Sequence, residues 1–423
     1  MTSTASEVRQ LDAGVAAVIT AGTCSGCGAC TLLDPALDMQ LDPQGFARPV
    51  RSGRPAAPRP GAGATFDAIC PGRIVRAGTP AGARRHPTLG PVVRAWEAWA
   101  ADPTIRHRGS SGGALTALVA WLTESGQVSS FTGARAEPSR PQRTVPVTIT
   151  SRAEALAAAG SRYGPVAALA GPDALQPGTG LVGKPCEITA ARALLDRSPA
   201  PTGVEPGTTE EPLLLSFFCA GTPSQDATDS LITELGVPAG TELSDMWYRG
   251  RGWPGHFTAE TTTGQRVSTT YEKSWGQYLG AALQWRCKIC PDGVGESADI
   301  SAADFWTSDE NGYPVFAEGE GSSAVLARTR RGEEVLNRAF DAGVLVGQPL
   351  VLDELAAVQP LQVDRRTTLL GRLVGARLAG RRTPRYVGFG LVRLALSQWH
   401  RSILVARGSY QRVRRSRSVQ APG

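Results

Sequence analysis

The sequence contains no apolar run long enough to cross a membrane. No stretch of about 18 uninterrupted apolar residues, which a spanning helix requires, occurs among the 423 residues. Residues 1–30 also lack the basic region followed by an apolar region that marks a secretory signal. We therefore expect a cytoplasmic protein. Thiols stay reduced in the cytosol, so we do not expect the eight cysteines to form a disulfide framework.

Several signatures of enzymes and nucleic-acid-binding proteins are also absent. There is no phosphate-binding P-loop, no Ser/His/Asp constellation and no paired-carboxylate pattern. No zinc-finger spacing or RNA-binding signature is present, so specific nucleic-acid binding is not expected. His107 and His256 lie near motif glycines and could protonate a substrate, but a single histidine is more often structural.

Basic residues are concentrated at the C-terminus. Residues 361–423 contain fourteen arginines, no lysine and one acid, Asp364, which gives them a net charge of +13. Because the whole chain carries +6, residues 1–360 carry −7. A basic tail on an acidic body predicts peripheral contact with an anionic surface, such as an acidic protein or lipid. The alternative is that these arginines are solvated faces of helices.

Hydrophobic periodicity predicts a globular α/β protein with mixed topology. Strand-like runs occur at 92–100, 144–150, 213–218, 246–249, 265–270 and 323–329, and helix-like runs at 153–159, 186–196, 226–235 and 331–342. A further helix is predicted to begin at Ser110 or Ser111, which are natural N-caps, and to end at Gly126. Residues 245–271 are typical of an antiparallel insertion, and residues 365–415 of helices interrupted at Pro384. Residues 15–80 show little periodicity outside their cysteine motifs.

The first four cysteines form a ferredoxin-type pattern. Residues 24–30 read CSGCGAC, and a Cys-Pro follows at 70–71. Two-residue spacing lets the backbone curl around one four-iron cluster and point three sulfurs inward, with glycines relieving the tight turns. The predicted ligands are Cys24, Cys27, Cys30 and Cys70. Four thiolates also make a zinc site, which is the alternative, although zinc sites usually pair two C-x₂-C units.

The other four cysteines come from three separate places. They are Cys186, Cys219 and the C-x₂-C pair Cys287 and Cys290. A single cysteine after an apolar strand, such as Cys219, is by default a small core residue. However, turn-forming Pro185, Gly221 and Pro291 accompany these cysteines, which favours a second metal site.

In order along the chain, these motifs resemble the beta subunit family of coenzyme F-420 hydrogenases and dehydrogenases. Relatives in that family include the F-420-dependent formate dehydrogenase beta subunit and the 7-hydroxymethyl chlorophyll a reductase. The matching stretches are CSGCGAC at 24–30, CPG at 70–72, RGSSGGALTAL at 108–118, SRYGPV at 161–166, VGKPCEI at 182–188, FFCAGTPS at 217–224, YRGRGWPG at 248–255 and RCKICPDGVGESADISAADFW at 286–306. The glycine that the family has before Asp304 is Ala303 here. The tail after residue 360 lies outside the shared pattern.

The resemblance implies an FAD-binding α/β core with two four-iron clusters beside the flavin. It implies one cluster on each cysteine set. We expect four segments: an iron–sulfur segment at 1–90, the N-terminal flavin-binding part of the core at 91–175, the C-terminal part with the second cluster at 176–345, and an Arg-rich helical tail at 346–423.

The resemblance also implies where the flavin binds. The Gly/Ser loop at 108–113 lies between a predicted strand and a predicted helix, where a helix N-terminus favours an anion, but it is not a dinucleotide fingerprint by itself. Lys184 is the candidate catalytic residue, because its charge would stabilise an anionic reduced flavin. The candidate flavin-binding residues are Ser110, Ser111, Gly112, Gly113, Thr116, Arg162, Tyr163, Gly183 and Lys184.

The expected function is therefore that of an iron–sulfur flavoprotein oxidoreductase. It would pass electrons between clusters and FAD and would reduce or oxidise coenzyme F-420 or an organic substrate. Its partner would be a ferredoxin or another redox subunit, and a homo-oligomer is compatible with the sequence. One alternative is a ferredoxin-dependent reductase of one metabolite that does not use F-420. Another, of a different class, is a non-enzymatic structural metal-binding module with a basic docking tail.

Overall fold

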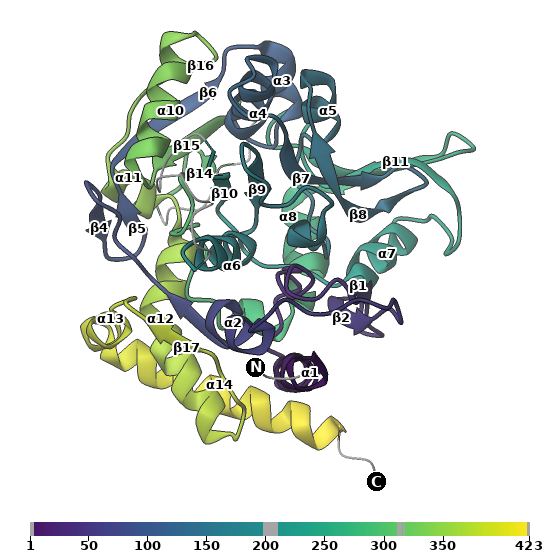
Figure 1. The fold of residues 1–423 in the computed structure, drawn as a ribbon. Coiled ribbons are helices and arrows are strands. Elements are labelled where there is room, and N and C mark those ends of the chain that lie inside the picture. Colours follow the sequence, from purple (N-terminus) through teal and green to yellow (C-terminus); the bar gives the residue numbers. More distant parts are fainter. Residues whose placement is uncertain (1–3, 198–209, 311–314, 316–317, 421–423) are drawn as a thin grey trace.

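A mixed eight-stranded sheet forms the centre of the molecule (Figure 1). The computed structural model describes residues 4–197, 210–310, 315 and 318–420. In order across the sheet, the strands are β16 (Leu345–Pro349), β6 (Arg94–Ala100), β15 (Ser322–Ala327), β14 (Ile300–Phe305), β10 (Leu213–Phe217), β9 (Gly180–Gly183), β7 (Phe131–Glu137) and β8 (Arg140–Ile149). The inner strands β14, β10, β9 and β7 run parallel, and the other neighbouring pairs run antiparallel. The predicted α/β class with mixed topology is confirmed.

Helices cover both faces of this sheet. Successive side chains of a strand point to opposite faces, so Leu213 and Leu215 of β10 enter one core cluster and Leu214 enters another. The first cluster includes helices α4 (Ala114–Glu124) and α10 (Arg330–Asp341), and the second includes α6 (Pro185–Leu195). The remaining core helices are α3 (Pro103–Arg108), α5 (Arg152–Ala157), α7 (Gln225–Glu234) and α11 (Leu352–Ala357). Both faces of the parallel strands are therefore buried, as such strands require.

The predicted helix after residue 110 exists, but it begins later than expected. Its N-cap is Gly113, in the left-handed conformation at φ 73°, and not Ser110 or Ser111. The Ser111 hydroxyl instead donates to the carbonyl of Ser322 at the start of β15. Because the Ser111 hydroxyl bonds to β15, it does not cap the helix. Gly126 follows the helix end with φ 69°, as predicted.

The N-terminal segment is more regular than its sequence indicates. It contains α1 (Thr4–Thr20), the hairpin of β1 (Leu37–Leu41) and β2 (Ala47–Arg51), α2 (Ala62–Ile69) and β3 (Ile74–Arg76). The expectation of little periodic structure was wrong here. Leu11, Val15 and Val18 of α1 form a buried stripe that packs in one cluster with Phe66 and Ile69 of α2.

The predicted antiparallel insertion is confirmed as a separate three-stranded sheet. It consists of β11 (Leu243–Trp247), β12 (His256–Thr261) and β13 (Arg266–Thr270). Short helices α8 (Tyr271–Lys273), η2 (Ser274–Leu279) and η3 (Gly280–Ala282) then lead to α9 (Trp285–Lys288). The insertion therefore ends directly before the C-x₂-C pair. The hairpin of β4 (Arg84–His86) and β5 (Gly90–Val92), and the single turn η1 (Ala168–Ala170), complete the body.

The C-terminal tail is a helical layer packed on the N-terminal segment (Figure 1). It comprises α12 (Pro360–Leu378), β17 (Arg385–Val387), α13 (Leu391–Ser397) and α14 (Trp399–Gln420), so the predicted interruption near Pro384 is confirmed. A Cβ atom on Gly371 or Gly375 of α12 would collide with carbonyl oxygens of α14, so these glycines allow the two helices to pack closely. Strand β17 pairs in parallel with β3. Within the described ranges, none of the helices combines the length and apolar character needed to span a membrane.

Candidate metal centres and the surrounding site

The four cysteines of the first set line one cavity. Cys24, Cys27, Cys30 and Cys70 surround it together with apolar side chains from α1, α2 and the β1–β2 hairpin, namely Val15, Val18, Ile19, Met39, Pro49, Phe66 and Ile69. Apart from Ser25, the other lining residues are apolar or glycine. The structure therefore brings together the four thiols that the sequence pattern assigns to one site.

The backbone between the first three cysteines requires its two glycines. Gly26 and Gly28 have φ of 72° and 86°, in the left-handed region that other residues rarely adopt. A Cβ atom on Gly26 would lie 2.9 Å from the carbonyl oxygen of Ala47, and one on Gly28 would lie 2.8 Å from the amide nitrogen of Ala170. The loop is thus held against the β1–β2 hairpin on one side and against η1 on the other.

Burial keeps the thiols of the first set protonated in the absence of a cation. Desolvation raises the pKa of Cys27 to about 11 and also raises the pKa values of Cys24, Cys30 and Cys70. The neighbouring thiols add to the effect, because each disfavours a second negative charge nearby. A bound metal reverses this preference, since a coordinating thiol is deprotonated outright.

The second set assembles at the carboxyl edge of the parallel strands. Cys186 follows β9 at the start of α6, and Cys219 follows β10, which pairs in parallel with β9. Parallel strands end at the same edge of a sheet, where open α/β proteins bind their ligands. Cys287 lies in α9 and Cys290 lies two residues beyond its end. Both are close to the chain after β10, since a Cβ atom on Gly221 would lie 3.2 Å from that of Cys287 and the charges of both cysteines act on Cys219. Burial and these neighbours raise the pKa of Cys219 to about 12.

The two cysteine sets are neighbours. Gln284 and Arg286, which lie just before Cys287, donate to the carbonyls of Ser25 and Pro71, each at 3.1 Å, and these two carbonyls lie beside Cys24 and Cys70. Among the described residues, no group of three or more His, Cys, Asp or Glu side chains is arranged as the ligands of a single metal ion. All eight cysteines are free thiols.

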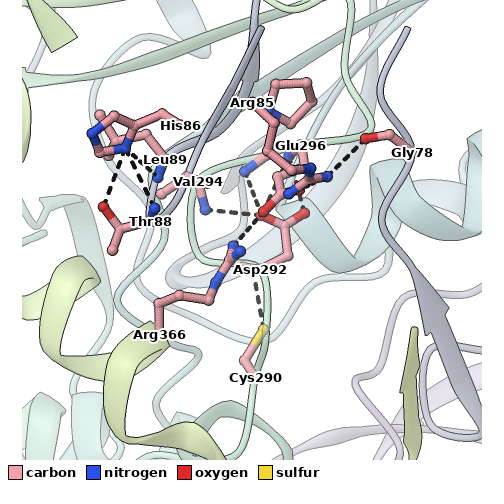
Figure 2. A network of polar contacts seen from close by, with 12 residues as sticks. Gly78, Arg85, His86, Thr88, Leu89, Cys290, Asp292, Val294, Glu296 and Arg366 are labelled. Atoms are coloured by element: carbon pink, nitrogen blue, oxygen red, sulfur yellow. Dashed lines mark hydrogen bonds and ion pairs between the residues drawn. The ribbon is translucent and has the colours of Figure 1, made fainter. Parts of the chain in front are cut away.

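A buried carboxylate holds the loop that follows Cys290 (Figure 2). Asp292 accepts hydrogen bonds from the amides of Val294 at 3.0 Å and Gly295 at 2.8 Å, and its own carbonyl accepts from the Cys290 thiol at 3.1 Å. Glu296 in the same loop pairs with Arg85 and with Arg366 of α12. This network attaches the second C-x₂-C motif to the body and to the tail.

Further contacts join the tail to the second set. Arg365 of α12 donates to the carbonyl of Cys219 at 2.8 Å and to that of Ala220. The Tyr386 hydroxyl of β17 donates to the carbonyl of Ile289 at 2.7 Å, between the two cysteines of the pair. Part of the basic tail is therefore an internal support for this site. The predicted docking to an anionic surface remains a prediction for the arginines that stay exposed.

The predicted flavin loop lies at the same sheet edge, and its polar groups contact the protein. The Ser110 hydroxyl lies 2.7 Å from that of Ser161, and the Gly112 amide donates to the Ser323 hydroxyl at 3.0 Å. A Cβ atom on Gly112 or Gly113 would collide with protein backbone. Thr116 is half-buried on α4. These glycines therefore allow close packing of the chain against itself.

Arg162 and Tyr163 are also engaged by neighbouring residues. The Arg162 guanidinium donates to the carbonyls of Met246, Pro141 and Arg143 and to the Thr144 hydroxyl. The Tyr163 ring packs against Tyr248, Tyr271 and Trp275. Both residues fasten the antiparallel insertion to the central sheet.

Lys184 is buried beside the second cysteine set. Its ammonium group donates to the carbonyl of Val166 at 2.8 Å and pairs with Glu187 at 2.5 Å. Burial opposes its charge, but Glu187 and Cys186 outweigh burial, so the pKa of Lys184 is raised. The preceding Gly183 ends β9, and its carbonyl accepts from the Ser216 hydroxyl at 3.0 Å.

Two buried arginines near the site were missed by the sequence interpretation. Arg249 pairs with Asp304 at 2.6 Å, lies over the rings of Trp253 and Tyr271, and donates to the carbonyl of Ser110. Arg286 lies between the two cysteine sets. Arg249 lies in the motif at 248–255, and Arg286 lies in the motif at 286–306. A basic residue directly before a C-x₂-C pair was the feature of the sequence that could have identified Arg286.

This fold and its two cysteine sets define a mixed α/β protein with two candidate metal centres at one edge of its sheet. Residues 95–171 match the family model described as "Coenzyme F420 hydrogenase/dehydrogenase, beta subunit N-term", and residues 178–351 match the model of the corresponding C terminus. The chain belongs to this family, as the sequence motifs indicate, and has an oxidoreductase role in redox electron transfer. The first cysteine set and the tail after residue 351 lie outside the matched ranges.

Individual relatives agree with this membership. The chain is 26% identical over 304 residues to the coenzyme F-420 hydrogenase subunit beta of Methanococcus voltae, which covers 70% of this chain and 99% of the relative. It is 26% identical over 306 residues to the same subunit of Methanothermobacter thermautotrophicus. A chain in a structure of the F-420-reducing NiFe hydrogenase complex of Methanosarcina barkeri has the same fold, with a TM-score of 0.54 and 22% identity over 71% of this chain and 98% of that chain.

Proposed function

We propose that this chain is an iron–sulfur oxidoreductase that exchanges electrons with coenzyme F-420 or an organic substrate. The observation that carries the proposal is the cavity lined by four thiols, three of them buried, and by apolar side chains. A four-iron cluster is held by four thiolates, and the C-x₂-C-x₂-C spacing followed by a distant Cys-Pro is typical of that cluster.

The second cysteine set supports a second cluster. Cys186, Cys219, Cys287 and Cys290 meet at the edge of the sheet where α/β proteins bind ligands, and buried cations surround them. Bound clusters would supply one-electron carriers at both sites. Because the two sets are neighbours, electrons could pass from one to the other within the chain.

FAD belongs to the proposal through the family resemblance alone. It would supply the conversion between two-electron exchange with a deazaflavin and one-electron exchange with the clusters. Lys184 and Arg162 already donate to carbonyl groups of the protein.

The electron partner is proposed to be another redox subunit or a ferredoxin. The solved relative is a chain in a hydrogenase complex, and the sequence relatives are hydrogenase subunits. The exposed arginines of the tail would favour an acidic partner through charge complementarity.

The decisive experiment is an anaerobic visible spectrum with iron, sulfide, zinc and flavin measured on the same sample. About eight irons per chain (two four-iron clusters) and a broad absorbance that dithionite bleaches are expected. A colourless protein that contains zinc and no iron would contradict the proposal and favour the structural metal-binding module.

Two single variants assign the iron to the two sites. Cys27→Ser and Cys219→Ser should each lose roughly half of the iron, about four atoms, because each removes one ligand of one cluster. Reduction of coenzyme F-420 by dithionite-reduced protein, with NAD(P) as the comparison acceptor, then tests the substrate. Activity with neither acceptor would favour the reductase of a single metabolite.

A further inference from the structure

A single buried arginine connects the two cysteine sets. Arg286 of α9 is 2% exposed, and its Nε donates to the carbonyl of Pro71 at 3.1 Å, directly after Cys70 of the first set. Its charge also acts on Cys70 itself. The guanidinium also forms a hydrogen bond with Cys290 of the second set, and the charge of Cys186 acts on it.

The charge of Arg286 has no carboxylate partner in the described part of the chain. Other buried arginines near the site do: Arg366 pairs with Glu296, and Arg249 pairs with Asp304. From the tail, the ring of Tyr386 packs against Arg286, with its centroid 5.7 Å from the guanidinium carbon. Because an arginine stays protonated in a protein and a buried charge needs a counter-charge, the compensating negative charge must come from the cysteine sulfurs.

Metal-bound thiolates provide that negative charge on both sides. Thiolates that ligate a cluster are ionised, and a four-iron cluster together with its four thiolates carries a net negative charge. A cation beside a cluster stabilises the reduced form, which is more negative by one electron, and so raises the reduction potential.

We propose that Arg286 is a positioning residue shared by both sites, which joins their loops and raises the reduction potentials of both clusters together. This inference rests on the proposed function. Arg365 offers a contrast on the same side of the molecule, because it donates to the carbonyl of Cys219 and its charge acts on the second set. Arg407 is an exposed arginine of α14 and serves as the control.

The test is an EPR-monitored redox titration of the full-length, iron-loaded protein. Arg286→Gln should shift both midpoint potentials to more negative values, Arg365→Gln should shift only that of the second cluster, and Arg407→Gln should shift neither. Unchanged potentials in an Arg286→Gln protein that retains wild-type iron, or a shift of one potential only, would overturn the inference.

A conservative variant covers the case in which Arg286→Gln loses iron. Arg286→Lys lacks the planar fork of arginine but keeps the positive charge, and because of that charge it should restore the iron content. Both midpoint potentials of the lysine variant should lie above those of any Arg286→Gln protein that still contains iron. Failure of lysine to restore iron would overturn the role of charge. If wild-type protein itself contains no iron, the proposed function fails, which is a different outcome from unchanged potentials in an iron-loaded variant.

Discussion

At the scale of single residues, Lys184 and Glu187 form a buried ion pair beside the second cysteine set. The exposed fractions of the two side chains are 9% and 1%. Glu187 also accepts from the amides of Ala168 and Lys184, at 3.0 and 2.7 Å. One carboxylate therefore orders η1, the start of α6 and the lysine beside Cys186.

Glu187→Gln should destabilise the protein strongly. The substitution leaves the Lys184 ammonium buried without a counter-charge, and breaking a buried pair in this way costs about 3–5 kcal/mol. Urea unfolding followed by circular dichroism measures the change in the free energy of unfolding. The matched control is Glu260→Gln, which removes the partner of the exposed Arg266 and should cost about 0–1 kcal/mol. Equal effects of the two variants would contradict this account of Glu187.

At the scale of elements, the tail acts on the second cysteine set through α12 and β17. Three side chains of the tail donate hydrogen bonds to backbone carbonyls of the second set. Gln362 and Arg365 donate to the carbonyl of Cys219, and Tyr386 donates to that of Ile289, which lies between Cys287 and Cys290. The sequence interpretation treated the tail as a docking element, because a cluster of arginines does not show which of them face inward. Packing decides this: the side chains of Arg365 and Arg366 are buried, whereas those of Arg407 and Arg414 are exposed.

Tyr386→Phe should loosen the second site without unfolding the protein. It removes one hydrogen bond to the Ile289 carbonyl, which contributes about 1 kcal/mol. We expect faster loss of iron to a chelator from the second site only, measured by absorbance with time. Tyr410→Phe on α14 is the control, since its hydroxyl contacts only the exposed Arg414 among the described hydrogen bonds, and it should lose iron at the wild-type rate. An unchanged rate for Tyr386→Phe would show that β17 does not support the site.

At the scale of the whole molecule, the two candidate centres lie where three parts of the chain meet. The first set joins α1, α2 and η1, and the second joins the central sheet, α9 and the tail. The bond between Arg286 and the Pro71 carbonyl and the pairing of β17 with β3 connect these parts. Metal bound at both sites would therefore stabilise the N-terminal segment, α9 and the tail more than it stabilises the central sheet.

Removal of the metal should loosen the periphery and leave the sheet intact. In metal-stripped protein, amide hydrogen exchange should accelerate in α1, α2 and β17, because their local unfolding no longer breaks ligand bonds. Exchange in β14 and β15, which are buried in the centre of the sheet, should not change and provides the internal reference. Faster exchange throughout the chain, or no change anywhere, would contradict this arrangement.

Much of the fold could be predicted from local pattern. The runs at 186–196 and 331–342 correspond to α6 and α10, because their apolar residues recur at the helical period. The run at 213–218 corresponds to β10, because a short continuous apolar run is typical of a parallel strand buried on both faces. Strands β9 and β14 were missed: GLVG and ISAADF are short and rich in glycine, alanine or serine, and become strands only between neighbours that complete their hydrogen bonds. Helix α1 was missed although its buried stripe was present in the sequence.

The sequence by itself determined that Cys24, Cys27 and Cys30 lie together and that Cys287 lies beside Cys290, because C-x₂-C spacing is a local constraint on where sulfurs can point. It also determined the family, through motifs that keep their order along the chain. Only the tertiary structure decided that the two sets are neighbours and that Arg286 lies between them. The bond from Arg286 to the Pro71 carbonyl joins residues 215 apart in the chain, and no local pattern specifies which buried groups will meet when the sheet and its surrounding helices pack.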